Sequence, residues 1–132
     1  MSKILALDLG GRRTGMAETD PMRMMAFPLT TVDTDALMGE LEAYVKLESP
    51  QVIVVGDPGE GTDSSALVGL WVEKLKAKWP TIEVVLVDES GTSNEASQAL
   101  VMGGMKKSKR REKGALDKVA AALILERYLA QR

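Results

Sequence analysis

The chain alternates between short apolar runs and polar turns, and this pattern predicts alternating strands and helices. Apolar runs bounded by Gly, Pro or Asp are typical of buried strands, and apolar residues three or four positions apart are typical of packed helices. The pattern predicts five strands, over residues 3–9, 14–19, about 24–32, 51–55 and 82–87. It predicts four helices, from the N-cap Thr34 to about Leu47, from the loop 57–62 to about Trp79, from the capping box 92–95 to about Met102, and over about 115–130.

The order of these elements predicts the fold class. Three strands joined by short turns come first, and strands separated by helices follow, which is typical of an α/β fold with a mixed five-stranded sheet and helices on both faces. Pro28 lacks the N–H group that a central strand needs, so its strand is expected to be irregular or at an edge. Right-handed crossovers would bring the carboxyl ends of strands 3–9, 51–55 and 82–87 to one edge, where ligands of open α/β sheets bind.

Length and composition narrow the function classes. The 132 residues suffice for one domain, and no linker or repeat divides them. No apolar stretch approaches the roughly 20 residues of a membrane span, and the first strand follows the N-terminus directly, so we expect a cytoplasmic protein without a membrane segment. The chain has no Cys and no His, which excludes disulfides and a Ser-His triad and argues against catalytic zinc. Acid–base chemistry would then depend on carboxylates, lysines, tyrosines or metal-bound water.

Three acidic residues stand where a carboxylate is costly unless it faces solvent, pairs with a cation or binds a metal. Asp8 ends one apolar run, Glu89 follows another, and Asp117 opens the alanine-rich C-terminal helix. Asp8 and Glu89 follow strands whose carboxyl ends should meet, so we expect their side chains to be neighbours. Asp117 shares a helical stripe with positions 121, 124 and 128, which should pack on the sheet, although it could instead only complement the helix dipole. Converging carboxylates predict a divalent-metal site suited to phosphodiester chemistry.

Positive charge is concentrated just before that helix, although the net charge of the chain is only −2. The basic residues of segment 106–113 are Lys106, Lys107, Lys109, Arg110, Arg111 and Lys113. A solvated loop is one interpretation of such a run. An arm that contacts the phosphates of a nucleic acid is the other, and the position of the run beside Asp117 favours it. We expect Arg12 and Arg13, which follow two glycines, to hold the same nucleic-acid backbone.

Other residues that could carry chemistry have simpler structural interpretations. Glu18 and Asp20 stand at a strand end before a proline and are typical of turns. Trp71 and Trp79 are expected to pack on the sheet rather than stack on bases. The methionines clustered at positions 22–25 are expected to fill the core, with an adaptable contact surface as the alternative.

Four segments, in this order, resemble the successive motifs of the YqgF/RuvX family. They are residues 8–15 (DLGGRRTG), 54–58 (VVGDP), 87–93 (VDESGTS) and 117–125 (DKVAAALIL). The family is described as Holliday-junction-resolvase-like and as a pre-16S rRNA nuclease, with a ribonuclease-H-like fold. The resemblance covers nearly the whole chain and implies a single three-layer ribonuclease-H-like nuclease domain over residues 1–132. It also implies a catalytic triad of Asp8, Glu89 and Asp117 that binds Mg²⁺ or Mn²⁺.

The activity that this resemblance implies is metal-dependent hydrolysis of phosphodiester bonds by an endonuclease. Its substrate would be structured RNA, in 5′-end processing of pre-16S rRNA during ribosome biogenesis, or branched DNA. The partner would therefore be a nucleic acid, and the protein could act as a monomer or a homodimer.

Three positions depart from the family pattern and keep other interpretations open. Gly11 replaces a usual Thr or Ser, Asp57 an apolar residue, and Ser90 an Arg. The missing Arg removes a fork that could bind phosphate, and Asp57 adds negative charge near the site. A nucleic-acid-binding or ribosome-associated module with weak or no catalysis is therefore a second hypothesis. A third, a nucleotide-binding fold of the actin and sugar-kinase type, rests on the similarity of segment 8–15 to a phosphate loop, but those proteins need two domains around the nucleotide.

Overall fold

The computed structural model of the chain describes residues 2–91 and 114–131. The expected helix over residues 92–102 and the basic segment 106–113 lie outside this described part. The strands are β1 (Leu5–Leu9), β2 (Arg13–Thr19), β3 (Ala26–Asp33), β4 (Val52–Asp57) and β5 (Glu83–Asp88). The helices are the 3-10 helix η1 (Thr34–Ala36) and the α-helices α1 (Leu37–Glu48), α2 (Asp63–Lys78) and α5 (Ala115–Gln131).

The strands form one mixed sheet in the order β3-β2-β1-β4-β5. β2 pairs antiparallel with both β1 and β3, whereas β1, β4 and β5 run parallel. This confirms the predicted mixed five-stranded sheet and brings the carboxyl ends of β1, β4 and β5 to the same edge. β3 lies at the other side of the sheet as an edge strand, and the β2–β3 register shifts between Met16 and Ala17, where Ala17 faces Pro28.

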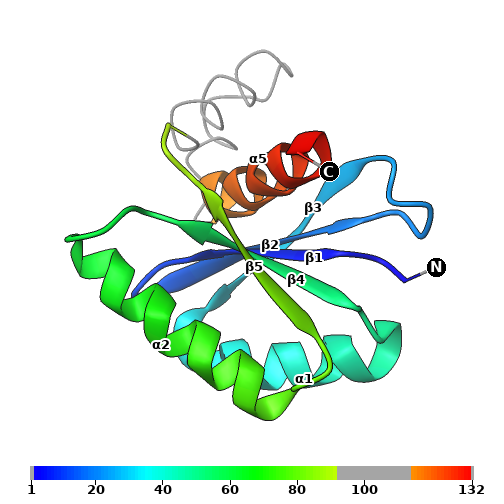
Figure 1. The fold of residues 1–132 in the computed structure, drawn as a ribbon, viewed down its shortest axis with the longest axis horizontal. Coiled ribbons are helices and arrows are strands. Elements are labelled where there is room, and N and C mark those ends of the chain that lie inside the picture. The colour runs from blue at the N-terminus through cyan, green and yellow to red at the C-terminus, as the bar shows by residue number, and fades with distance from the viewer. Residues whose placement is uncertain (1, 92–113, 132) are drawn as a thin grey trace.

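Helices cover both faces of the sheet and complete the predicted three-layer fold (Figure 1). α1 and α2 lie on one face and α5 on the other. The buried core between the sheet and α1 and α2 includes Leu5, Leu7, Met16, Leu41, Ile53 and Trp71. The core under α5 includes Ile4, Ala6, Val54, Val87, Ala121 and Ile124. Trp71 and the partly buried Trp79 pack in the first core, as predicted. Within the described part of the chain, no helix combines the length and the hydropathy of a membrane span.

Strand periodicity determines which way Asp8 points. Successive side chains of a strand face opposite sides of the sheet. Along β1, Leu5 and Leu7 lie in the core under α1 and α2, whereas Ile4 and Ala6 lie in the core under α5. Asp8 continues the second series, so its carboxylate faces α5, the helix that carries Asp117.

Thr34 does not cap α1, contrary to the prediction. It is the first residue of η1, whose N-cap, Asp33, makes no side-chain hydrogen bond. The Thr34 hydroxyl instead donates to the Gly10 carbonyl at 2.5 Å and shares a hydrogen bond with the Thr14 hydroxyl at 2.9 Å. Its N–H donates to the Arg12 carbonyl at 2.9 Å. The Thr34 side chain therefore hydrogen bonds to residues distant in sequence instead of capping a helix, and these bonds hold the β1–β2 turn in place.

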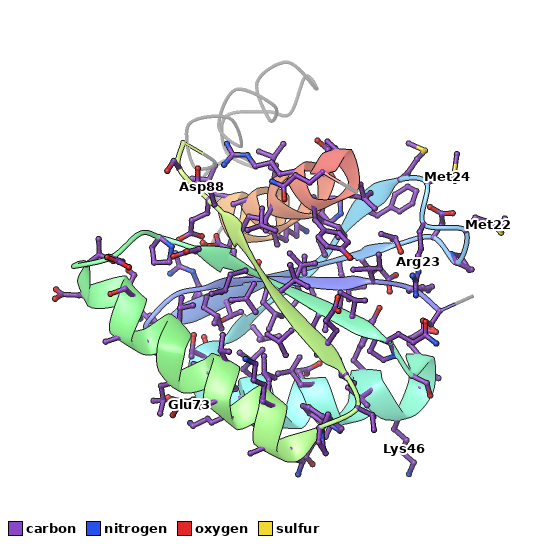
Figure 2. All side chains as sticks on the ribbon, in the orientation of Figure 1. Met22, Arg23, Met24, Lys46, Glu73 and Asp88 are labelled. Atoms are coloured by element: carbon purple, nitrogen blue, oxygen red, sulfur yellow. The ribbon has the colours of Figure 1, made fainter. Side chains whose placement is uncertain are left out.

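The methionine cluster at positions 22–25 also differs from the prediction. Met22, Met24 and Met25 are 66%, 76% and 60% exposed, and the first two point away from the molecule (Figure 2). The Asp20 carboxylate accepts hydrogen bonds from the N–H groups of all three, which holds the hairpin tip in shape. These methionines therefore do not fill the core, because they lie on the exposed connection between β2 and β3. Asp20 is a turn residue, as predicted.

Candidate active site

Asp8 lies between two glycines on neighbouring strands. In the β1–β2 ladder its partner is Gly15, and in the β1–β4 ladder Leu7 pairs with Val55, so that Gly56 follows beside Asp8. Glycine is unusual inside a strand and marks places where another group approaches the backbone closely. Here the two glycines flank the carboxylate on the face that α5 covers.

Gly15 is the point at which α5 approaches the sheet. A Cβ atom at this position would overlap the carbonyl group of Asp117 and crowd the N atom of Lys118. The first turn of α5 therefore lies directly on β2, in the row of the sheet that contains Asp8. Thr31, the partner of Gly15 on β3, donates a 2.6 Å hydrogen bond to the carbonyl of Gly114, just before the helix. This contact and the missing side chain of Gly15 together place Asp117 near Asp8.

Gly56 has the corresponding role on the other side of Asp8. A Cβ atom there would come within 2.6 Å of Oε2 of Glu89 and within 2.6 Å of Cδ1 of Ile124. The Glu89 carboxylate therefore lies over the backbone of β4. Its own backbone is held where the β4–β5 ladder ends, by a 3.1 Å hydrogen bond from the Glu89 N–H to the Asp57 carbonyl.

Asp8 and Glu89 are close enough for a hydrogen bond between their carboxyl groups. Burial raises the pKa of Asp8, the hydrogen bond with Glu89 lowers it, and the charge of Asp117 raises it further. Burial, the same hydrogen bond and the charges of Asp8, Asp57 and Asp88 raise the pKa of Glu89 to about 8. A hydrogen bond between two carboxyl groups requires a proton, so the pair shares one when no cation is bound.

Asp117 pairs with a cation that the chain itself supplies. Nε of Arg13 lies 3.0 Å from Oδ2 of Asp117, and both side chains are partly exposed. Arg13 lies on β2, two residues before Gly15, and therefore on the same face as Gly15. Arg12, its neighbour in sequence, is exposed. Of the two arginines expected to hold a phosphate backbone, one is thus directed at the acidic residues and the other at solvent.

Two of the three predicted carboxylates are placed so that they could bind one divalent cation, and the third is not. Within the described residues, no group of three His, Cys, Asp or Glu side chains is arranged to hold a metal ion as it stands. Asp8 and Glu89 are adjacent hard oxygen donors that now share a proton, and such donors suit Mg²⁺ and Mn²⁺. Oδ2 of Asp117 is paired with Arg13. Asp117 would therefore have to bind the cation through Oδ1, or its side chain would have to rotate away from Arg13. The structure therefore brings two of the predicted ligands into contact and places the third beside them on an ion pair.

Two other acids that the sequence singles out, Asp88 beside the site and Glu18 at the opposite end of β2, have structural partners. The Asp88 side chain accepts hydrogen bonds from the N–H and the hydroxyl of Ser90, at 3.1 and 2.7 Å, and closes the turn after β5. Ser90, which replaces the expected Arg, is therefore used within its own turn. Glu18 accepts from the Tyr44 hydroxyl at 3.0 Å and pairs with Lys3 at 3.5 Å, so its role is structural, but it lies within β2 and not in the predicted turn.

Three residues that shape this site, Gly15, Gly56 and Arg127, were not among the predicted site residues. Gly15 and Gly56 stand inside apolar strand patterns, and that was the signal available for a close approach of another group. Arg127 was the third. Its guanidinium reaches the carbonyl groups of Asp88 and Ser90 from α5, at 2.8 and 2.7 Å, and no local pattern indicates these partners.

Comparison with known proteins places this arrangement in a family. Residues 2–131 match the family described as "RuvX: Holliday junction resolvase". The chain belongs to this family. The resemblance inferred from the four motifs is thereby confirmed, and with it the predicted enzyme class, a nuclease that hydrolyses phosphodiester bonds.

Relatives extend over the same length. A protein of Christiangramia forsetii is 40% identical over 133 residues, covers 98% of both chains and is named "Putative pre-16S rRNA nuclease". A protein of Chlorobium luteolum with the same name is 38% identical over 133 residues, covering 98% of this chain and 94% of its own.

Solved structures confirm the ribonuclease-H-like fold of the resolvases. RuvC of T. thermophilus, solved with a Holliday junction substrate, has a TM-score of 0.60 at 16% identity and covers 99% of this chain and 96% of its own. The fowlpox virus resolvase, solved with Holliday junction DNA, has a TM-score of 0.60 at 13% identity, with coverage of 98% and 97%. At these identities the likeness concerns the fold alone.

Proposed function

We propose that this chain is a divalent-metal-dependent endonuclease whose catalytic residues are Asp8, Glu89 and Asp117. The observation that carries the proposal is the packing around Asp8, where Gly56 leaves room for the Glu89 carboxylate and Gly15 leaves room for the first turn of α5. Acids at three distant places in the sequence approach one another only because these two positions lack side chains.

Mg²⁺ or Mn²⁺ is the cofactor that this donor set favours. When bound, such an ion polarises a phosphodiester and lowers the pKa of a water molecule, and neither effect requires a histidine. Asp8 and Glu89 would hold it through hard oxygen atoms, after the pair has released the proton that it shares. Asp117 would complete the set, and Arg13 beside it would then be available to contact a phosphate oxygen.

The proposed substrate is a phosphodiester of structured RNA in the 5′ region of pre-16S rRNA. The names of the full-length relatives support this choice, and the family description supports branched DNA as the second substrate to test. The exposed Arg12 and the basic residues of segment 106–113 would neutralise backbone phosphates. We propose one nuclease domain over residues 1–132 that acts in the cytoplasm as a monomer or homodimer.

Cleavage assays with matched variants test this proposal. Labelled RNA with a 5′ precursor extension and a four-way DNA junction would be incubated with Mg²⁺, Mn²⁺ or EDTA. We expect metal-dependent cleavage, and loss of at least about 100-fold of the rate in Asp8→Asn, because the central carboxylate is gone. The control is Glu73→Gln, an exposed acid on α2 at the opposite face, which should cleave like the wild type. Wild-type cleavage by Asp8→Asn would refute the proposed site.

A binding module without turnover is the second candidate. The specific observation in its favour is the Arg13–Asp117 ion pair, which engages one of the three acids. Retained RNA binding without cleavage in any divalent metal would support this candidate and reject the nuclease.

A further inference from the structure

A side chain of α5 holds the turn that carries Glu89. Arg127 of α5 donates from Nη1 to the carbonyl of Asp88 at 2.8 Å and from Nη2 to the carbonyl of Ser90 at 2.7 Å. These are the carbonyl groups on either side of Glu89. Figure 2 shows Asp88 at the end of β5, on the face of the sheet where α5 lies.

Few other contacts within the described part of the chain fix this backbone. The β4–β5 ladder ends at the pair Asp57 and Asp88, and beyond it the Glu89 N–H bonds to the Asp57 carbonyl. Asp88 and Ser90 hydrogen bond to each other, which closes the turn locally but does not attach it to the rest of the protein. The fork from Arg127 attaches the backbone on both sides of Glu89 to α5.

We propose that Arg127 is a positioning residue that sets the place of Glu89 relative to Asp117, an inference that rests on the proposed metal site. Both Arg127 and Asp117 belong to α5. Ten steps of the α-helix separate their backbones by a fixed distance of about 15 Å along the helix axis. The helix thus presents one candidate ligand directly and holds the backbone of another. Coordination tolerates little displacement of a carboxylate, so a fixed turn favours binding of the ion.

The chemistry of arginine suits this role. A guanidinium group is planar, and two of its N–H groups can reach two acceptors at a fixed spacing, whereas a lysine ammonium is a single point of charge. The turn has Ser90 where the family pattern has an arginine, and here a guanidinium reaches it from α5 instead.

Mn²⁺ binding by the full chain tests the proposal. Calorimetric titrations would compare the wild type with Arg127→Gln, Arg127→Lys and the control Glu126→Gln, which alters an exposed neighbour on the same helix. We expect the Arg127 variants to bind Mn²⁺ about 10- to 100-fold more weakly, as is typical when a residue supporting a ligand is lost. Amide hydrogen exchange at residues 89–91 should become faster, while the strands keep wild-type protection.

The readouts separate the possible outcomes. If Arg127→Gln does not fold, Arg127→Lys decides the question, because it keeps the charge and the aliphatic part of the side chain. Mn²⁺ affinity within twofold of that of Glu126→Gln in the folded Arg127 variants would overturn the positioning role. Asp8→Asn, titrated in parallel, distinguishes this failure from failure of the site itself. If Asp8→Asn binds Mn²⁺ like the wild type, the proposed metal site is wrong, whatever Arg127 does.

Discussion

Gly15 lies directly across from Asp8 in the β1–β2 ladder. Because Gly15 has no side chain, the first turn of α5 packs directly against its backbone. Two residues of the same strand pair thus have complementary roles. Asp8 supplies the central carboxylate, and Gly15 allows the helix that carries Asp117 to come close enough to serve the same site.

Substitution of Gly15 by Ala should displace α5 from the sheet. The added Cβ would overlap the backbone carbonyl of Asp117, and backbone cannot move aside as a flexible side chain can. We expect a loss of about 1–3 kcal/mol in the free energy of unfolding, the usual effect of overpacking, and a loss of cleavage larger than the fraction unfolded explains. Denaturant melts and cleavage rates measure the two effects.

Gly69→Ala is the matched control for this change. Gly69 lies in α2, where no atom is within 4 Å of an added Cβ, so the variant should be stabilised by about 0.5–1 kcal/mol and cleave normally. Equal behaviour of the two alanine variants would contradict the account of Gly15.

Gly56→Ala should impair the site more than the fold. The new Cβ would meet Oε2 of Glu89 and Cδ1 of Ile124, both at 2.6 Å, and both are the far ends of flexible side chains. The protein should therefore keep its fold while the Glu89 carboxylate moves from its place over β4. We expect a melting temperature within a few degrees of the wild type and Mn²⁺ binding weaker by about 10-fold or more. A variant that binds Mn²⁺ normally would show that this carboxylate is not a ligand.

The stability of the metal-free protein should fall as pH rises from about 4.5 to 8. Burial and the neighbouring Asp8 raise the folded pKa of Glu89 to about 8 from its ordinary value of 4.5, so the folded state binds more protons than the unfolded state in this range. The contribution of Glu89 is thus fully present below the unfolded pKa and is lost as pH passes the folded pKa. Melting temperatures measured from pH 4 to 9 in EDTA test this.

Two comparisons isolate the contribution of Glu89. Glu89→Gln cannot ionise, so its melting temperature should decline less over the same pH range. Mn²⁺ should stabilise the wild type more at pH 8 than at pH 5, because binding replaces the proton that Glu89 holds. Parallel pH profiles of wild type and variant would show that this carboxyl group has an ordinary pKa.

Arg13→Gln should separate stability from substrate binding. The Arg13–Asp117 pair is partly exposed to solvent, so its loss should change the free energy of unfolding by no more than about 1 kcal/mol. Removal of a cation beside Asp117 should strengthen Mn²⁺ binding, whereas loss of a proposed phosphate contact should raise KM for RNA. Weaker Mn²⁺ binding would instead indicate that Arg13 orients Asp117 for the metal.

The sequence by itself determined the framework of this protein. Alternating apolar positions in β1 determine that Asp8 faces away from Leu7. The element order determines that the strand containing Asp8 and the strand preceding Glu89 run parallel. The sequence also shows that positions 117, 121, 124 and 128 share one face of a helix, because the 3.6-residue period does not depend on what the helix packs against. These features depend on local geometry, which a short segment contains.

Only the tertiary structure decided which side chains meet. Arg13 pairs with Asp117 across 104 residues, and Arg127 binds the carbonyl groups of Asp88 and Ser90 across 39 and 37 residues. Thr34 hydrogen bonds to Gly10 and Thr14 instead of capping α1. The methionines at positions 22–25 are exposed and lie outside both cores. Such partnerships depend on where α5 and the hairpins come to lie once the whole core has packed. No segment of the sequence carries that information alone, because the free energy of each contact depends on groups that other segments bring to it.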